Sequence, residues 1–302
     1  MTYYLLANPN SGAGKGARTL ETLIPYLEKK NYEYRLFKTK AAGEEGALVR
    51  QILDLKNPDD HLVIIGGDGT ISLVINELPE EEAFSYIPSG SGNDFARSLQ
   101  LKLDPIESFE AARRGINHEI FIMNYQSKGL SGYALNNIGI GLDATIVKSA
   151  NEGKLKQVLN KLKLGSFSYI LTALHVLITK KPFPALIEVE NQEISLENAF
   201  LMTFTKHPYF GGGVKISPEA TNENAYIHLV EYNKHHLLRT FSLIPSVLCG
   251  MHLKHPLFLH RVSSQFSVEL AESQPVQIDG EIHELVAADR LSISTERRMI
   301  IY

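Results

Sequence analysis

The first hundred residues alternate short apolar runs with longer segments of helical periodicity. The apolar runs predict strands at 3–7, 32–37, 61–65 and 84–87, and the segments between them predict helices at 15–30, 44–56 and 71–78. This alternation predicts a parallel, doubly wound sheet. A sheet of this kind binds its ligand at the carboxyl ends of its strands.

The pattern changes from about Glu119 onward, where the apolar runs become shorter and are broken by polar residues. Strands are predicted at 185–189, 199–204, 226–230, 266–270 and 276–278. We interpret these as a second, mostly antiparallel domain. A chain of 302 residues is long enough for two ordinary cores.

The segment 154–181, "KLKQVLNKLKLGSFSYILTALHVLITKK", differs from both domains. Its first part is basic with apolar residues at helical spacing, and its second part is largely apolar. Two interpretations stay open: a core helix with a solvated basic face, or a helix that faces an anionic lipid surface.

Composition and charge exclude several classes of function. The formal net charge of −4 provides no overall field to attract nucleic acid, so an anion site must be local. The single cysteine, Cys249, allows no internal disulfide, no CxxC pair and no zinc cluster, which favours a reducing cytosol. No signal sequence and no run of about 18 apolar residues is found.

Histidine and serine motifs also give no catalytic site of their own. The segments "NKHHLLR" and "MHLKHP" lack the HExxH spacing of a zinc protease, so we expect surface or packing histidines. "GSGND" is not a G-x-S-x-G elbow, because Ser91 is followed by Gly92 and Asn93.

Three predicted strand ends carry unusual loops, and "NPNSGAGKG" is the first. It is not a Walker loop, because Lys15 is followed by Gly16 instead of Ser or Thr. Backbone N–H groups around Ser11, Gly12 and Gly14 are able to bind an anion at the start of a helix. A plain tight turn stays the alternative.

The second loop, "GGDGT", places Asp68 where a phosphate-binding turn is expected. A phosphate there would lie a few ångströms from the carboxylate, at a cost of about 1 to 4 kcal/mol. A cation must separate the two, and Mg²⁺ held by carboxylates and substrate phosphates fits this need. Thr70 is expected to cap the following helix. An Asp-Gly turn without a ligand stays the alternative.

The third loop, "PSGSGNDFARSL", has a similar design. Gly90 and Gly92 allow close approach of the backbone, and Asn93 or Asp94 is expected to begin a helix as its N-cap. Adjacent strand ends meet at one edge of a parallel sheet. We therefore expect Asp68 and Asp94 to converge there.

Asp279-Gly280 lies between "PVQI" and "EIHEL". From the residues alone it is a common dipeptide of hairpin turns, and this predicts a structural role.

These motifs together resemble the diacylglycerol kinase catalytic domain family of bacterial lipid kinases, which is related to sphingosine and ceramide kinases. The resemblance rests on "NPNSG", "GGDGT" and "GSGNDFAR" in this order, and then on "NIGIGLDATIV", "FGGGVKISPEA" and "VQIDGE". It spans nearly the whole chain. "GGDGT" alone is shared with NAD kinases, but the opening "NPxSG" and the "GSGND" block are not typical of them.

The resemblance implies an α/β fold with two domains and an active site in the cleft between them. Residues 1–122 would form a doubly wound, NAD-kinase-like nucleotide domain, and 123–295 a β-rich sandwich domain that binds the lipid. The last strand, 296–302, would pack back on the first domain.

The resemblance also implies roles for particular residues. ATP would contact Asn8, Pro9, Asn10, Ser11, Gly12, Thr39, Gly66, Gly67, Asp68, Gly69, Thr70, Ser91 and Asn93. Asp68 and Asp94 would hold the magnesium ion. Asp279 would be the general base for the acceptor hydroxyl, with Glu281 close by. The resemblance thus reverses the structural interpretation of the Asp279 turn.

Two departures from the family pattern change these expectations. Glu119 stands near the domain junction where related kinases usually have an aspartate, and it would reach the metal through water. Asn224-Ala225 stands where they have an Asp-Gly pair that supports a second, structural magnesium. Loss of that charged ligand predicts that the second metal is absent.

The expected function is transfer of the γ-phosphate of ATP, with Mg²⁺, to a lipid alcohol such as diacylglycerol, which would give phosphatidic acid. The enzyme would be cytoplasmic, contact the inner face of the membrane peripherally and bind no nucleic acid. Monomer and homodimer stay open. The alternatives are an NAD kinase and a catalytically silent nucleotide-binding relative.

Overall fold

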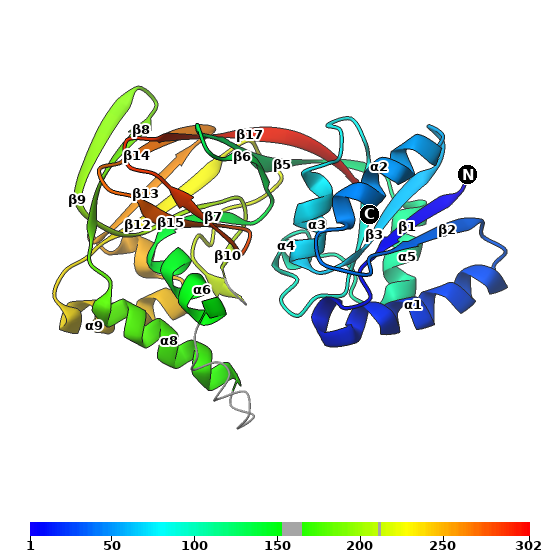
Figure 1. The fold of residues 1–302 in the computed structure, drawn as a ribbon, viewed down its shortest axis with the longest axis horizontal. Helices are drawn as coiled ribbons and strands as arrows, with labels where there is room; N and C mark the ends of the chain where they lie inside the picture. Colours follow the sequence, from blue (N-terminus) through cyan, green and yellow to red (C-terminus); the bar gives the residue numbers. More distant parts are fainter. Residues whose placement is uncertain (153–164, 211–212) are drawn as a thin grey trace.

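The structure is a computed structural model that describes residues 1–152, 165–210 and 213–302. Two lobes lie side by side, and two long strands, β5 and β17, run from one lobe to the other (Figure 1). Both termini lie on the same lobe, so the chain leaves this lobe once and returns to it at its end.

The N-terminal lobe is a parallel sheet flanked by helices. Its elements are β1 (Tyr3–Ala7), α1 (Ser11–Lys29), β2 (Tyr34–Lys38), α2 (Glu45–Leu55), β3 (His61–Gly66), α3 (Asp68–Ile75), β4 (Phe84–Pro88), α4 (Asp94–Ser98) and α5 (Pro105–Arg114). The strand order is β2-β1-β3-β4 with parallel pairing throughout. The predicted doubly wound parallel sheet is confirmed.

Consecutive apolar residues in these strands are explained by burial on both faces of the sheet. Along β1, Leu5 packs toward α1 and α5, whereas Leu6 packs toward α2 and α3. In α1, the residues Gly12 to Gly14 have positive φ angles. The first loop therefore keeps a loop conformation, and the regular part of α1 starts near Lys15, as predicted.

The C-terminal lobe is built mainly from antiparallel strands. Its elements are β6 (Ser131–Ala134), β7 (Asn137–Gly141), α6 (Leu142–Glu152), α8 (Gly165–Thr179), β8 (Phe183–Val189), β9 (Gln192–Thr205), β10 (Tyr209–Phe210), β11 (Val214–Lys215), β12 (Ile227–Asn233), α9 (Leu237–Leu248), the 3-10 helix η1 (His252–Lys254), β13 (Phe258–Ser263), β14 (Gln265–Leu270), β15 (Gln274–Ile278) and β16 (Glu281–Leu285).

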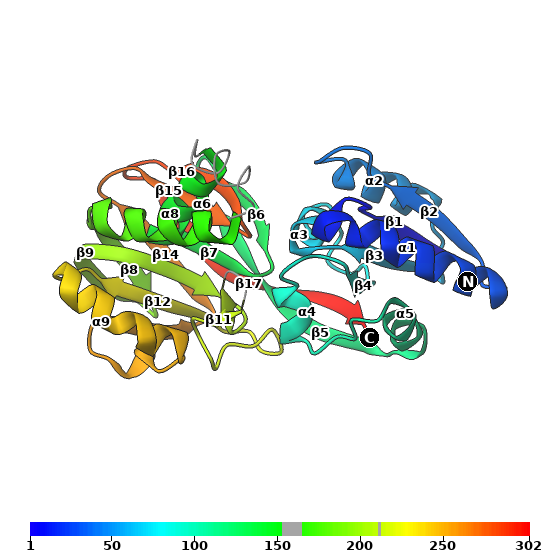
Figure 2. The ribbon, with the colours of Figure 1, turned by 90° about the horizontal axis from the view of Figure 1, so that it is seen from below.

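These strands enclose one apolar core and leave a second face for helices. Met202 and Phe204 of β9 pack with Leu229 of β12 inside the core of the sandwich. Residues of α8 and α9 pack over Phe200 and Tyr232 instead, and Figure 2 shows α6 and α8 running beside the strands. The predicted β-rich sandwich domain is confirmed.

A two-stranded ribbon of β5 (Asn117–Gln126) and β17 (Arg290–Ile301) joins the lobes. The beginning of β17 pairs with β14 of the C-terminal lobe, and Ile300 near its end pairs with Phe84 of β4 in the N-terminal lobe. One continuous sheet therefore passes through both lobes. The predicted boundary at 122–123 falls within β5.

The basic half of the predicted amphipathic segment, residues 154–164, lies outside the described residues. The apolar half forms α8. Among the helices that the structure describes, none combines the length and apolar character needed to cross a membrane.

Candidate active site

The glycine-rich loops at the strand ends contact one another. A Cβ atom on Gly90 would lie 2.7 Å from the Cα of Gly67, so neither loop has room for a side chain at this contact. The first loop joins them through Ser11, whose hydroxyl lies 2.7 Å from that of Ser89. Backbone from three strand ends is thus gathered at one edge of the sheet.

Asp68 fixes the geometry of the third loop. Its carboxylate accepts hydrogen bonds from the backbone N–H groups of Asp94 (3.2 Å) and Phe95 (3.3 Å) at the start of α4. The prediction that Thr70 caps α3 was wrong, and that for α4 is confirmed only in position. Asn93 is the N-cap residue of α4, as predicted, but its side chain makes no capping hydrogen bond, and Asp68 of the neighbouring loop accepts from the first N–H groups instead. Thr70 lies inside α3, where it accepts a hydrogen bond from Asn8.

The electrostatic environment of Asp68 favours a cation. Burial raises the pKa of its carboxyl group, and the nearby charge of Asp94 raises it further, against the opposing backbone hydrogen bonds. Asp94 is 9% exposed and forms an ion pair with Arg97 at 2.7 Å. A positive charge beside this pair of carboxylates offsets their repulsion, as Arg97 does for Asp94.

A magnesium ion fits the two carboxylates. Mg²⁺ is usually held by one or two protein carboxylates and completes its coordination with water and substrate phosphates. Among the described residues there is no group of three or more His, Cys, Asp or Glu side chains that could hold a metal on its own. Asp68 and Asp94 therefore suit an ion that arrives with a nucleotide.

Asp279 lies across from these loops, in the turn between β15 and β16. Ile278 pairs with Glu281, which leaves a two-residue turn, and both Asp279 (φ 48°) and Gly280 (φ 94°) have positive φ angles. These are features of a type I′ hairpin turn. The turn expected from the residues alone is therefore present at the position that the resemblance implies is catalytic.

The Asp279 carboxylate accepts four hydrogen bonds. Oδ1 accepts from the N–H groups of Asn136 (2.8 Å) and Asn137 (3.1 Å), and Oδ2 accepts from the Leu135 N–H (2.8 Å) and the Ser72 hydroxyl (2.8 Å). Burial raises its pKa, and these donors act in the opposite direction. Ser72 belongs to α3, so this carboxylate connects the two lobes.

A cavity of about 260 Å³ brings the predicted acidic residues together. It is lined from the N-terminal lobe by Asp68, Gly92 and Asp94. From the C-terminal lobe it is lined by Asn136, Asn137, Asp143, Ile146, Val147, Phe210, Gln277, Asp279 and Gly280. We call this space the acidic cleft.

The other predicted ATP-binding residues surround the loops on the N-terminal lobe. Asn8 donates to Thr70 (3.1 Å) and Glu45 (3.3 Å) and accepts from the Asn10 N–H (3.0 Å). Thr39 is buried at the carboxyl end of the sheet, where its N–H bonds to Ala7 (3.0 Å). Pro9 and Gly69 belong to the same loops, and Ser91 is exposed at the tip of the third.

A groove of about 330 Å³ beside these loops is lined by two positively charged side chains, neither of which was predicted as a site residue. Lys15 and Arg18 of α1 line it together with Ser89, Gly90 and Asn93. The position of Lys15 directly after the glycine loop was the available signal, because that residue lies at the start of the helix.

Glu281 and Glu119 do not line the acidic cleft. Glu281 is exposed at the start of β16, next to the Asp279 turn. Glu119 lies on β5, where its carboxylate pairs with Arg297 at 3.4 Å. Arg297 and Glu119 are both well exposed to solvent, and the role of Glu119 at the metal stays a prediction.

A buried lysine lies at the position expected for a second, structural magnesium. The ammonium group of Lys206 donates to the carbonyls of Asn224 and Tyr226, both at 2.6 Å. The side chain is fully buried, and burial lowers its pKa to about 7. A side-chain cation thus already binds these carbonyls, and the absence of a second metal stays a prediction.

An apolar cavity of about 280 Å³ adjoins the acidic cleft. It lies among α6, α8, α9 and the sheet, and its walls include Leu142, Leu177, Leu201, Tyr232, Leu243 and Phe258. Asp143, Ile146 and Phe210 line both spaces, so the polar and apolar cavities share a wall. No sequence motif indicates this cavity, because its walls come from segments far apart in the chain.

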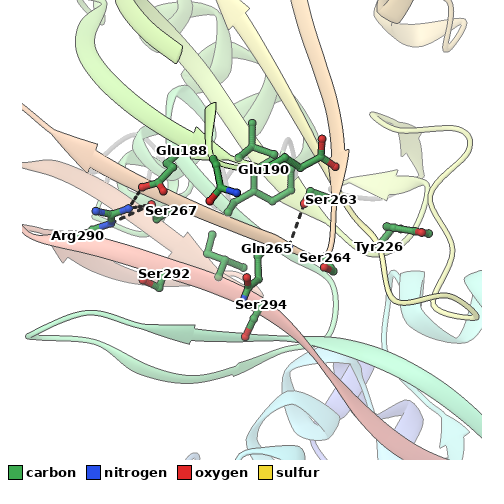
Figure 3. Close-up of a pocket in the computed structure, with 14 residues that line it drawn as sticks. Glu188, Glu190, Tyr226, Ser263, Ser264, Gln265, Ser267, Arg290, Ser292 and Ser294 are labelled. Atoms are coloured by element: carbon green, nitrogen blue, oxygen red, sulfur yellow. Dashed lines mark hydrogen bonds and ion pairs between the residues drawn. The ribbon is translucent and has the colours of Figure 1, made fainter. Parts of the chain in front are cut away.

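A larger polar groove of about 480 Å³ lies elsewhere on the C-terminal lobe. Figure 3 shows that serine side chains and an ion pair between Arg290 and Glu188 dominate it. None of the predicted catalytic, metal or nucleotide residues lines this groove. Size alone therefore does not locate the active site.

Comparison with known proteins agrees with this geometry. Residues 2–125 match the family model of the diacylglycerol kinase catalytic domain. Residues 136–292 match the model described as the YegS C-terminal NAD kinase beta sandwich-like domain. The two matches correspond closely to the two lobes.

Individual relatives cover almost the whole chain. A putative lipid kinase, YtlR of Bacillus subtilis, is 29% identical over 93% of this chain and 93% of its own length. A diacylglycerol kinase of Staphylococcus carnosus is 26% identical over 96% of this chain and 91% of its own length.

The fold is also found among solved structures. A putative diacylglycerol kinase from Bacillus anthracis superposes with a TM-score of 0.77 at 21% identity, and the match covers 100% of this chain and 95% of that one. The family models and relatives together show that this chain belongs to the diacylglycerol kinase family and is a lipid kinase.

Proposed function

We propose that the protein transfers the γ-phosphate of ATP to the hydroxyl of a lipid alcohol in a magnesium-dependent reaction. The observation that carries this proposal is the acidic cleft. Carboxylates from both lobes, Asp68, Asp94 and Asp279, face one space that adjoins an apolar cavity. Diacylglycerol is the acceptor named for several relatives, and its phosphorylation would give phosphatidic acid.

Phosphoryl transfer depends on positioning and on neutralising the charge of the phosphates. Asp68 and Asp94 would hold Mg²⁺, which supplies part of this neutralisation when it is bound. The backbone of the contacting glycine loops would hold the phosphates, and Lys15 and Arg18 would add positive charge nearby.

Asp279 is proposed as the general base. Its raised pKa makes its carboxylate a better proton acceptor than an exposed aspartate. All four of its hydrogen-bonding positions are occupied, and among the described residues only Ser72 reaches it from the other lobe. We propose that the acceptor hydroxyl replaces Ser72 as the donor to Oδ2 and that its proton passes to this oxygen during transfer.

The apolar cavity would hold an acyl chain of the acceptor. Its surrounding helices also expose apolar side chains, including Leu171, Leu174 and Ile178 of α8 and Leu238 of α9. The described parts of α8 and α9 contain no acidic residue, and Arg239 of α9 is exposed. We propose that this α8–α9 surface contacts the membrane peripherally, which would place the protein at its inner face.

The experiment that tests the proposed function measures phosphate transfer from labelled ATP into a panel of lipid alcohols that includes diacylglycerol, with NAD as a further acceptor. The Asp279→Asn variant should lose about 10²- to 10⁴-fold in kcat, the usual contribution of a general base. Glu284→Gln, an exposed change on the same hairpin, should keep normal activity.

Three results would contradict the proposal. Full activity of Asp279→Asn would remove the proposed base. Phosphorylation of NAD in place of lipid would establish the NAD kinase alternative. ATP binding without release of ADP in the presence of any acceptor would indicate a silent relative.

A further inference from the structure

Asp143 occupies the boundary between the acidic cleft and the apolar cavity. It lies in the first turn of α6 and lines both spaces, together with Ile146 and Phe210. An acyl chain in the apolar cavity and a reacting hydroxyl at Asp279 would put the polar head of the lipid beside this residue. This placement rests on the proposed function.

The Asp143 carboxyl group is buried, and one of its two oxygens lacks a well-aligned hydrogen-bond donor. The residue is 4% exposed, and Gln277 donates to its Oδ2 at 3.2 Å. Oδ1 has no hydrogen-bond partner among the described residues. Burial raises the pKa of the group to about 6, against the opposing effect of the Ala144 N–H. An unpaired buried oxygen is costly, so it needs an explanation.

The strand below Asp143 leaves space for its carboxylate because it has a glycine there. Gly139 on β7 lies beneath it, and a Cβ atom at that position would overlap the Asp143 carboxylate. Gly139 pairs with Gln277 on one side and Thr203 on the other. The Thr203 hydroxyl is also buried and has no partner within the described part of the chain. The carboxylate of Asp143 thus lies over the row of the sheet to which Thr203 belongs.

We propose that Asp143 binds a second hydrogen-bond donor on the acceptor lipid, next to the hydroxyl that is phosphorylated. A donor in this position would satisfy Oδ1 when the lipid is bound. The acceptor class that fits is a lipid with adjacent donors, such as a monoacylglycerol or a long-chain amino alcohol. Diacylglycerol fits less well, because its only donor is the reacting hydroxyl and its ester oxygens only accept.

The test compares two acceptors that differ only in this donor: 1-oleoylglycerol and its 2-O-methyl ether, each in the same detergent micelles. In the wild-type enzyme, methylation should lower kcat/KM by roughly ten- to hundredfold, the effect expected for a hydrogen bond to a buried charged group. Equal rates for the two acceptors would overturn the proposal, whatever the behaviour of any variant.

The Asp143→Asn variant tells whether methylation acts by removing a hydrogen bond to Asp143 or by a steric clash of the added methyl group. Because Gln277 donates to Oδ2, the asparagine oxygen should take that place and its NH₂ should replace Oδ1. The effect of methylation should then fall below about threefold. An equal methylation effect in wild type and variant would mean a steric cause and would also overturn the proposal.

Two further measurements separate a failure of the Asp143 proposal from a failure of the proposed function. Glu190→Gln in the serine-rich groove is the control and should keep the wild-type ratio. If neither acceptor nor 1,2-dioleoylglycerol takes up phosphate, the proposed function itself fails. If 1,2-dioleoylglycerol is used as well as 1-oleoylglycerol, only the role of Asp143 fails.

Discussion

At the scale of single residues, Asp279 would combine a structural role in its turn with the proposed role of general base. The hairpin requires a residue that tolerates a positive φ angle, and aspartate does so more readily than most. The same turn points its carboxylate at four donors, one of them from the other lobe. The sequence pattern alone predicted the turn, whereas the contacts of the carboxylate appear only in the structure.

Glu231 gives a prediction about stability at the same scale. It is 1% exposed on β12, its Oε1 has no partner among the described residues, and burial raises its pKa to about 8. The unfolded chain releases this proton near 4.5. The stability that the protonated group contributes is therefore complete below about pH 4.5 and is lost as the pH rises through about 8.

Replacing this group should remove its pH dependence. Relative to Glu231→Gln, the wild-type free energy of unfolding should fall by at most about 1.4 kcal/mol per pH unit within this window. Urea unfolding of both proteins at several pH values measures this difference. Parallel pH profiles would show that Glu231 is already ionised in the folded protein.

At the scale of elements, the site depends on loops that pack against each other more than on any one motif. Gly67 and Gly90 lie close enough to exclude side chains, and Asp68 of one loop caps the helix that follows the other. "GGDGT" and "GSGND" therefore act as one unit. Their contact explains why the capping residues within each motif do not serve their own helices.

The exposed apolar residues of the α8–α9 surface lead to a prediction about binding to membranes. Leu238 is 86% exposed on α9, and Met251, just beyond the helix, is 61% exposed. Changing both to aspartate should weaken binding to phosphatidylglycerol-containing vesicles about tenfold or more, because apolar contact is lost and like charge is added. Vesicle flotation measures this binding.

The control is Val286→Asp, which changes an apolar residue about as exposed as Met251 (57%) in the turn between β16 and β17. It should bind vesicles like the wild type. Equal loss in the control and in the double variant would assign the effect to net charge, and unchanged binding of the double variant would exclude this surface as the membrane contact.

At the scale of the whole molecule, several contacts connect the lobes. The ribbon of β5 and β17 extends the sheet through both, Ser72 donates to Asp279, and Asn76 after α3 exchanges hydrogen bonds with the backbone of Tyr133. These contacts lie beside the acidic cleft. They join the two walls of the cleft directly.

This connection predicts that the lobes unfold together. Calorimetry should show one transition whose calorimetric and van't Hoff enthalpies agree. Ile300→Ala, which truncates the buried residue that pairs β17 with Phe84, should lower the free energy of unfolding by about 2 to 5 kcal/mol and keep the single transition. Two separate transitions would show that the lobes are independent units.

The sequence by itself determined the parallel sheet, the order of its elements and the loops that end its strands. The physical reason is that these features are local: a buried strand requires a continuous apolar run, and a phosphate-binding turn requires glycine within a few residues. The change of pattern after Glu119 likewise predicted the β-rich domain.

Only the tertiary structure decided which side chains meet. Asp68 caps a helix 26 residues away, Ser72 reaches Asp279 across 207 positions, and Glu119 is held by Arg297. The cavity walls and the unpaired oxygen of Asp143 also arise only when distant segments pack. Burial and partner choice depend on these long-range contacts, and hydrophobic periodicity along the chain carries no information about them.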